Sequence, residues 1–212
     1  MHVRFISIAM AAAATCAALW SVLFHLELGT HTESSRGRCE SVQLKRELVR
    51  RVASPKLAVI AGSSAARGVN AEILSQVTGR QTVNFGLFAG IGPDVVLYEA
   101  RRILKPGDTA LIALEYNHFV SEGPSADAID YVLGCGREFF RLLPLAEKIR
   151  YVFSLPLSRV YRSLATPPAH ASKGSDGSPL TALGDTKLVP KVFPPISEQD
   201  RTRMSLYRPM PI

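Results

Sequence analysis

Residues 55–64, PKLAVIAGSS, indicate the architecture of this chain. The apolar run Leu57-Ala58-Val59-Ile60 follows Pro55-Lys56 and stops at Gly62-Ser63-Ser64. A short apolar run that ends in a tight Gly/Ser turn is typical of a strand buried in a parallel sheet. We therefore expect a strand here, with two serines at its carboxyl end.

A first crossover follows this strand. Asn70 can cap a helix that runs through Val77, and Gly79 can end that helix in the left-handed conformation that glycine tolerates. Residues 82–86 then predict a second strand. The spacing is that of a strand–helix–strand unit.

A second crossover begins at Gly92-Pro93-Asp94, which puts proline at the first helical position and a carboxylate in the first turn. Apolar residues at helical spacing then predict a core-facing stripe: Val96, Leu97, Ala100, Ile103 and Leu104. Residues 109–115 predict a third strand, which its composition suggests is buried on both sides. Strands and helices alternating at these lengths require a parallel sheet with right-handed connections.

The expected fold class is therefore α/β, with a parallel sheet of flavodoxin-like type and flanking helices. Residues 127–164 predict helical segments, and Lys187–Phe193 predict an edge strand because Pro190 cannot donate a hydrogen bond to a neighbour. We expect the α/β domain over residues 55–193, cut short at its carboxyl end, and an irregular tail over 194–212.

Residues 1–28 predict a membrane segment. The run from Phe5 to Leu26 contains no Asp, Glu, Lys or Arg, and it is close to the roughly 20 residues that a helix needs to cross a bilayer. We favour an uncleaved signal anchor, which makes membrane lipid a partner. A cleaved signal peptide, a lipoprotein signal ending at Cys16 and a buried soluble helix are the alternatives.

Residues 29–54 predict a polar stalk followed by a basic helix from Cys39 to Val52. Basic residues over 36–51 and 137–162 account for much of the net charge of +7. A membrane surface explains both groups at least as well as nucleic acid does, and no nucleic-acid-binding motif is present. We expect the domain on the extracytoplasmic side, although the first basic group opposes export under the positive-inside rule.

The composition limits the chemistry. The chain has 212 residues, of which 47% are hydrophobic and 20% charged, and this excludes a disordered or multi-span membrane protein. Its three cysteines are too few for a four-cysteine zinc site, and we expect no metal and no cofactor. Cys39 and Cys135 could form a disulfide in an oxidising compartment, although nothing in the sequence places them together.

Polar residues follow each of the three predicted strands: Ser63-Ser64, Asn84 and Asn117-His118. Ligands of open parallel sheets bind at the carboxyl ends of the strands. A serine hydroxyl beside backbone N–H groups and an asparagine amide is the composition of an oxyanion site for acyl chemistry. In the alternative interpretation, the same serines and asparagines only cap turns and bond to loop backbone.

Three segments resemble a known family: VIAGSSAARG (59–68), NFGLFAGIGP (84–93) and LEYNHF (114–119). They are similar to blocks I, II and III of the SGNH (GDSL-like) hydrolase superfamily, in particular its membrane-anchored, exported branch. The resemblance covers roughly residues 55–187.

This resemblance implies Ser64 as the nucleophile, with Ser63 in place of the aspartate that usually precedes it. It also implies an oxyanion N–H from Ala89 or Gly90, and Asn117 as a side-chain oxyanion donor. The activity implied is that of an O-acyl (acetyl) esterase or acyltransferase acting on acylated carbohydrate of the cell envelope.

The catalytic base of the superfamily lies in a late D-x-x-H block, and no Asp of this sequence precedes a His by three positions. His118 and His170 are weak substitutes, because one alternates with Asn117 on a strand end and the other lies in a predicted loop. The alternative is therefore a catalytically silent domain that binds or scaffolds polysaccharide-assembly machinery. A third interpretation is a nucleotide- or small-ligand-binding domain that uses helix amino termini as anion sites.

Overall fold

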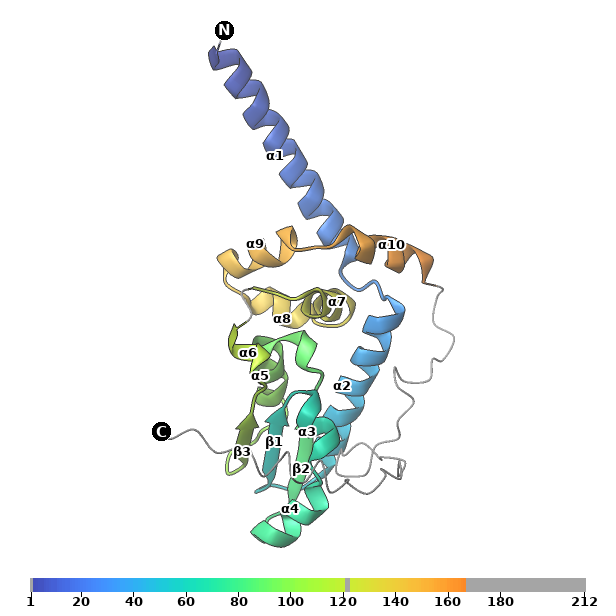
Figure 1. Ribbon diagram of the computed structural model, residues 1–212, viewed down its shortest axis with the longest axis vertical. Helices are drawn as coiled ribbons and strands as arrows, with labels where there is room; N and C mark the ends of the chain where they lie inside the picture. Colours follow the sequence, from blue (N-terminus) through green and yellow to red (C-terminus); the bar gives the residue numbers. More distant parts are fainter. Residues whose placement is uncertain (1, 121–122, 167–212) are drawn as a thin grey trace, which may run out of the picture.

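The computed structural model describes residues 2–120 and 123–166 (Figure 1). The strand expected at 187–193 and the tail at 194–212 lie outside these residues. In chain order the elements are α1 (His2–Glu27), α2 (Glu33–Arg51), β1 (Leu57–Ala61), α3 (Ser63–Gly68), α4 (Ala71–Thr78), β2 (Thr82–Gly86), the 3-10 helix η1 (Ala89–Ile91), α5 (Pro93–Arg101), β3 (Thr109–Ala113), α6 (Asn117–Val120), α7 (Ala126–Gly134), α8 (Arg137–Leu142), α9 (Leu145–Phe153) and α10 (Leu157–Ala165).

The three strands form a parallel sheet in the order β2-β1-β3. Leu57 is in register with both Thr82 and Thr109, so the strands start level with one another. The order 2-1-3 is also the order at the start of a flavodoxin-like sheet. The prediction of a mixed α/β chain with a parallel sheet and flanking helices is confirmed.

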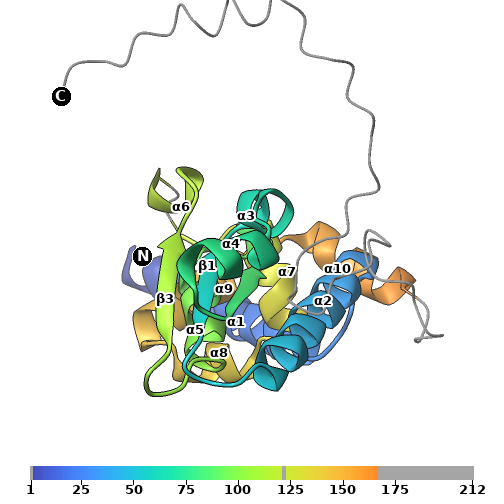
Figure 2. The same ribbon diagram turned by 90° about the horizontal axis from the view of Figure 1, so that it is seen from below.

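The sheet separates two apolar layers, because successive residues of a strand point to opposite faces. Ala58 and Ile60 belong to the larger core cluster, which includes residues of α2 and α5. Val59 and Ala61 pack instead with Ala65 of α3. Figure 2 shows α3 and α4 on one side of the sheet and α2 and α5 on the other.

The helix before β2, α4, begins and ends where the sequence predicts, whereas α5 begins at the predicted position but ends at Arg101, before the last two residues of the predicted stripe. The Asn70 side chain accepts a hydrogen bond from the Ile73 N–H at 3.0 Å, and Gly79 ends α4 with a φ of 65°. Pro93 stands in the first turn of α5. Three residues of the predicted stripe are buried, whereas Leu97 is exposed.

The third strand differs from the prediction. β3 is exposed along its whole length, and 47% of Leu111 and 55% of Ile112 is accessible to solvent. The expectation that residues 109–115 are buried on both sides is therefore wrong. The apolar composition suits a sheet interior, but β3 is the edge of the sheet that the described residues form, and no neighbouring strand pairs with it there.

The second helix also differs, because α2 begins at Glu33 and not at Cys39. The Thr32 hydroxyl accepts a hydrogen bond from the Ser35 N–H at 3.1 Å, and the Ser35 hydroxyl accepts one from the Thr32 N–H at 2.9 Å. This reciprocal cap starts the helix six residues before the predicted position. Part of the predicted stalk is therefore folded and packs on the domain.

A layer of helices, α7 to α10, lies beyond the carboxyl ends of the strands, between the sheet and α1 (Figure 1). The last turns of α1 are part of this layer. The Trp20 indole N–H donates to the Val152 carbonyl at 2.9 Å, and the rings of Phe24 and Phe140 are 5.0 Å apart. The remainder of α1 projects from the domain, and α1 over residues 3–27 is long and apolar enough to span a membrane.

A buried polar cluster holds this junction together. The Arg159 guanidinium is fully buried and pairs with Glu27 at the end of α1 and with Asp130 of α7, the latter at 3.2 Å. It also donates to the Thr30 carbonyl at 2.7 Å. A buried charge of this kind is tolerated because it is paired and hydrogen-bonded on every side.

One disulfide closes the fold. Cys39 of α2 is bonded to Cys135 at the end of α7, with the two Cα atoms 6.0 Å apart. The pairing left open by the sequence is therefore present in the structure. Cys16, the remaining cysteine, is free and exposed on α1.

Candidate functional site

The predicted nucleophile lies at the carboxyl end of the central strand. Ser64 stands in the first turn of α3, directly after β1, and is exposed. Glu115 approaches this turn closely, because a Cβ at Gly62 would lie 2.6 Å from the Glu115 Oε1 and 3.0 Å from the Ala89 Cβ. The turn after β1 is thus shaped to bring Ser64 against the residue that follows β3.

Glu115 occupies the amino terminus of α3. Its Oε1 accepts a hydrogen bond from the Ser64 N–H at 2.7 Å and one from the Ser63 hydroxyl at 3.4 Å. Burial by itself would raise the pKa of Glu115, but hydrogen bonds from Ser64 and Ser63 lower that pKa. The carboxylate is therefore ionised at neutral pH and fills the anion position at the start of α3.

His118 joins the end of β3 to the turn after β2. Its Nδ1 accepts a hydrogen bond from the Glu115 N–H at 3.0 Å, and its Nε2 lies 3.0 Å from the Ala89 carbonyl oxygen. Since a carbonyl can only accept, Nε2 carries the proton and the ring is neutral. His118 is buried, and both of its nitrogens are used by backbone.

The Ala89–Gly90 turn is packed against the start of α7. The Gly90 carbonyl accepts a hydrogen bond from the Ser125 hydroxyl, and a Cβ at Gly90 would lie 2.5 Å from the Asp127 Oδ2. Arg38 of α2 neutralises that carboxylate at 2.7 Å. The absence of a side chain at Gly90 lets Asp127 pack closely against this turn.

Asn84 is a structural residue. It is fully buried in β2, and its amide donates to the carbonyls of Ala65 and Val69 at 2.9 and 3.1 Å. Its oxygen accepts the Gly86 N–H at 2.9 Å. These bonds to loop and strand backbone fix α3 against β2, and they favour the interpretation in which this asparagine has a structural role.

Asn117 is the first residue of α6. Its backbone follows Glu115 and Tyr116 at the same end of the sheet, whereas its side chain lies outside the description. Its assignment as an oxyanion donor therefore stays a prediction.

A series of three hydrogen bonds links Ser64 to Ala89 in the structure. Ser64 bonds to Glu115, Glu115 bonds to His118, and His118 bonds to Ala89. Gly90 lies next to this series of hydrogen bonds. The series runs from the end of β1 to the end of β3, which is the switch point where open α/β sheets bind ligands.

Among the described residues, this arrangement provides no catalytic base for Ser64. The neutral His118 is committed to two backbone groups, and the Glu115 carboxylate has a lowered pKa, which makes it a weaker proton acceptor than an ordinary glutamate. The other described histidines belong to α1 or to the turn after it. Within residues 2–120 and 123–166, no group of three His, Cys, Asp or Glu could hold a metal ion.

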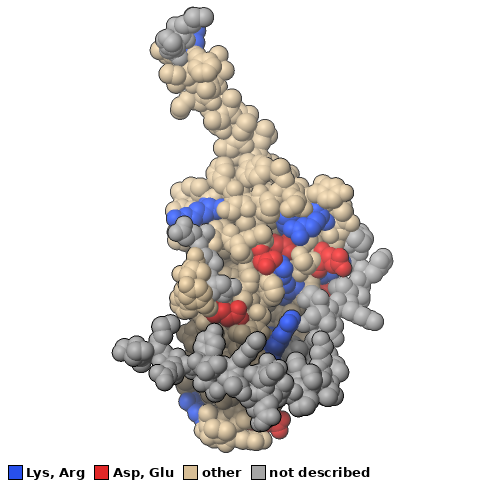
Figure 3. Space-filling model, in the orientation of Figure 1, with Lys and Arg blue, Asp and Glu red and all other residues tan. Residues whose placement is uncertain are grey.

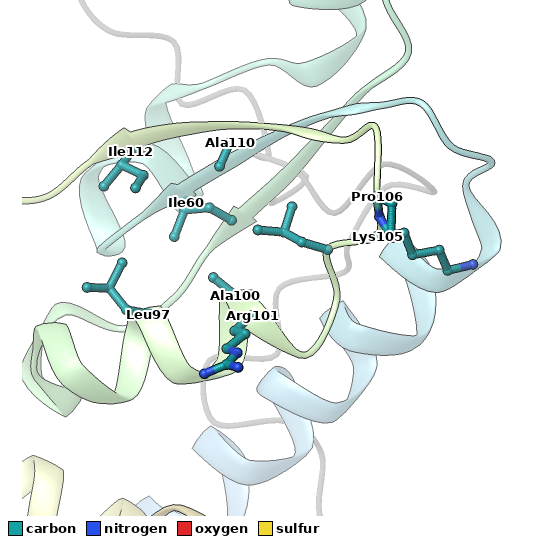
Figure 4. A pocket seen from close by; sticks show the side chains of 9 residues that line it. Ile60, Leu97, Ala100, Arg101, Lys105, Pro106, Ala110 and Ile112 are labelled. Carbon is teal, nitrogen blue, oxygen red and sulfur yellow. The ribbon is translucent and has the colours of Figure 1, made fainter.

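An apolar groove of about 410 Å³ lies away from these groups, on the α5 face of the sheet (Figure 4). Ile60, Ala110 and Ile112 form its floor, and Leu97 and Ala100 of α5 form a wall. None of the predicted site residues lines it. The groove exists because the described sheet ends at β3.

Sequence reasoning missed Glu115 and the structural role of His118. A signal for Glu115 was present, because it is a carboxylate at the end of one strand while a Gly-Ser-Ser turn opens a helix at the end of the neighbouring strand. The contact of Glu115 with the start of α3 depends on β1 and β3 being neighbours, as they are in the order β2-β1-β3.

No family model, no curated protein and no solved structure matches this chain. The resemblance to the SGNH hydrolases therefore depends on the three sequence segments, and membership of that superfamily stays a prediction.

Proposed function

We propose that this protein is a membrane-anchored, SGNH-like α/β domain that binds or scaffolds envelope-polysaccharide machinery and does not cleave esters on its own. The polysaccharide connection comes from the resemblance of the three segments to the exported branch of that superfamily. The absence of catalysis is argued from the site.

The contact between Glu115 and Ser64 is the observation that carries this proposal. An acyl-transfer serine needs N–H groups aimed at the developing oxyanion. Here the Ser64 N–H is bonded to a carboxylate at 2.7 Å. A second negative charge at that position would be repelled, so the resting site is closed to the oxyanion of an ester substrate.

The anchored, extracytoplasmic placement is supported by two features. Residues 3–27 of α1 have the length and hydropathy of a membrane span. The Cys39–Cys135 disulfide favours an oxidising compartment, because disulfides rarely persist in the cytosol. The basic residues that follow the span oppose export under the positive-inside rule. Two of them have structural roles, since Lys45 donates to the Gly86 carbonyl at 2.6 Å and Arg46 pairs with Glu99 at 3.1 Å.

An O-acyl esterase or acyltransferase is the second candidate, and one observation favours it. Ser64 is exposed at the switch point of the sheet, where a substrate could reach its hydroxyl. In this function Ser64 is the nucleophile, and Ala89 or Gly90 and Asn117 stabilise the oxyanion. Glu115 must then leave the Ser64 N–H, and the base must come from outside the described residues.

Hydrolysis of acetyl esters separates the two candidates. The protein in detergent or nanodiscs is compared with Ser64→Ala and with Ser63→Ala as the matched control. We expect rates within twofold of one another, while an O-acetylated oligosaccharide binds without turnover. A loss of tenfold or more in Ser64→Ala alone would replace the first proposal by the second.

A further inference from the structure

The outer face of α9 is apolar. Leu145, Ile149 and Phe153 follow one another at every fourth position, and between 48% and 73% of each is exposed. Tyr151, on the opposite face, is buried. The Tyr151 ring packs edge-on against rings of α8, so the apolar stripe points away from the domain.

The amphipathic pattern of α10 is reversed with respect to that of a soluble surface helix. Its inward face carries Arg159 and Ser163, which bond to Glu27 at the end of α1. Its outward face carries Leu157, Tyr161 and Leu164, which are between 64% and 81% exposed. A helix on a water-facing surface turns its apolar stripe to the core, whereas α10 turns it outward.

Both helices, α9 and α10, lie across the foot of α1, which is the part of α1 from Trp20 to Glu27 that packs on the domain. Figure 1 shows α9 and α10 on opposite sides of the point where α1 enters the domain, with α7 and α8 beneath them. Because their inner faces pack on α7 and α8, their outer faces look toward the projecting part of α1. Figure 3 shows uncharged surface around the foot of α1 and basic side chains on both flanks.

The length of α1 puts this surface at the level of lipid. The uncharged residues that project freely, Phe5 to Leu19, span only about 22 Å at roughly 1.5 Å per residue. The hydrocarbon core of a bilayer is about 30 Å thick. The missing length, on the order of 8 Å, has to come from Trp20 to Leu26, which is the part of α1 that α9 contacts.

Basic residues border the two apolar stripes. Lys148 and Arg150 lie on either side of the α9 stripe by helical spacing, and Arg162 lies beside the α10 stripe. Arg150 is largely exposed and pairs only with Glu147 of its own helix, among the described residues, at 3.1 Å. Long cationic side chains at the edge of an apolar face reach lipid phosphates while their stems stay in apolar surroundings.

We propose that α9 and α10 lie in the headgroup–acyl boundary of the membrane that α1 crosses, so that the domain is seated directly on the bilayer. The partner of this surface is lipid with anionic headgroups. The inference rests on the membrane anchor of the proposed function and adds a second, parallel contact. Interfacial helices enter the boundary by about 5–10 Å, which agrees with the length that α1 lacks.

Fluorescence quenching in vesicles tests this contact of α9 and α10 with the bilayer, which we call the seat. The full chain carries Cys16→Ser and one new cysteine, Leu145→Cys on α9 or Tyr161→Cys on α10, labelled with an environment-sensitive dye. Vesicles contain phosphatidylcholine and phosphatidylglycerol at three to one, with or without lipid that carries a quencher near the glycerol. Val77→Cys on α4, at the far end of the domain and 77% exposed against 74% for Tyr161, is the matched control.

We expect lipid-borne quencher to reduce the signal at positions 145 and 161 at least threefold more than at 77, and aqueous iodide to do the reverse. Equal iodide quenching at 161 and 77 would overturn the seat. Protection of 161 from both quenchers would also overturn it, because a protein would then cover this face.

A label on the native Cys16 reports the anchor separately, with a second set of vesicles whose lipid carries the quencher at the end of the acyl chain, because residue 16 lies at the middle of the uncharged run from Phe5 to Leu26 and so near the bilayer centre. If lipid-borne quencher reaches Cys16 but not 145 or 161, the anchor stands and the seat is wrong. If it does not reach Cys16, the membrane anchor of the proposed function fails, and the seat fails with it.

Discussion

Glu115 shows how one side chain can decide the chemistry of a site. Placed after β3, it reaches the first N–H groups of the helix that follows β1. The same position without a carboxylate would leave an open helix amino terminus beside an exposed serine. Its role could not be predicted from residues 114–119 alone, because it depends on the partner strand and not on the local motif.

Replacing Glu115 by alanine is expected to loosen the start of α3. A hydrogen bond to a charged acceptor contributes roughly 1.5 kcal/mol, so the Ser64 amide should exchange with solvent about tenfold faster. Glu115→Gln keeps an acceptor and should show a smaller change. Unchanged exchange of the Ser64 amide in Glu115→Ala would show that the contact does not hold the helix.

Lys56 and Asp108 form a buried pair at the opposite end of the sheet. Their charged atoms are 2.9 Å apart, and both side chains are almost fully buried. Burial by itself would raise the pKa of Asp108, but hydrogen bonds from Lys56, Lys105 and Ser54 hold that pKa well below its usual range. The folded state therefore binds this proton only at lower pH than the unfolded state does.

Asp108→Asn is expected to reduce the free energy of unfolding by about 3–5 kcal/mol, because it leaves Lys56 buried without its counter-charge. The native protein should lose stability as the pH falls below about 4, where the unfolded carboxyl begins to protonate, and the variant should lose less. Denaturant titrations at several pH values measure both effects. Asp94→Asn, at the exposed first turn of α5, is the control and should cost at most about 1 kcal/mol.

The elements predicted most accurately are those with strong local signals. β1, β2, α4 and α5 have apolar periods bounded by Asn, Gly or Pro, and they appear at the expected positions. α2 begins earlier than expected because residues 33–38 are polar and look like a stalk. Their partner is Asp130 of α7, whose carboxylate accepts hydrogen bonds from Thr32 and Ser34. No local pattern contains that contact.

Asn84 connects two elements, and its removal tests whether α3 depends on β2. Asn84→Ala leaves the carbonyls of Ala65 and Val69 and the Gly86 N–H without this partner. Each buried unpaired group costs roughly 1–3 kcal/mol, so we expect α3 to lose protection before the sheet does. Hydrogen exchange resolved by residue measures this, and Asn70→Ala, which removes the α4 cap, should loosen α4 instead.

At the scale of the whole molecule, two long-range links hold the helical layer together and attach it to α2. One is the Arg159 cluster, and the other is the disulfide between residues 96 positions apart. The sequence leaves the pairing of Cys39 with Cys135 open, and it contains no sign of the Arg159 cluster, because each link joins segments whose separation along the chain is large. Together they fix the foot of α1 relative to the domain.

Replacement of both Cys39 and Cys135 by serine is expected to reduce the free energy of unfolding by about 4–5 kcal/mol, since the bond closes a loop of nearly 100 residues. Thermal unfolding in detergent with and without reductant measures the loss. Cys16→Ser removes a free, exposed thiol and should change nothing. Equal stability of the double variant and the native protein would contradict a structural role for the bond.

The central claim is that the site at the carboxyl edge of the sheet is closed around Ser64. The most direct test is treatment of the intact protein with a serine-reactive fluorophosphonate, followed by mass spectrometry of the peptide that contains residues 62–68. The closed site predicts no adduct on Ser64. Stoichiometric labelling of Ser64 that disappears in Ser64→Ala would contradict the account and establish a nucleophilic serine.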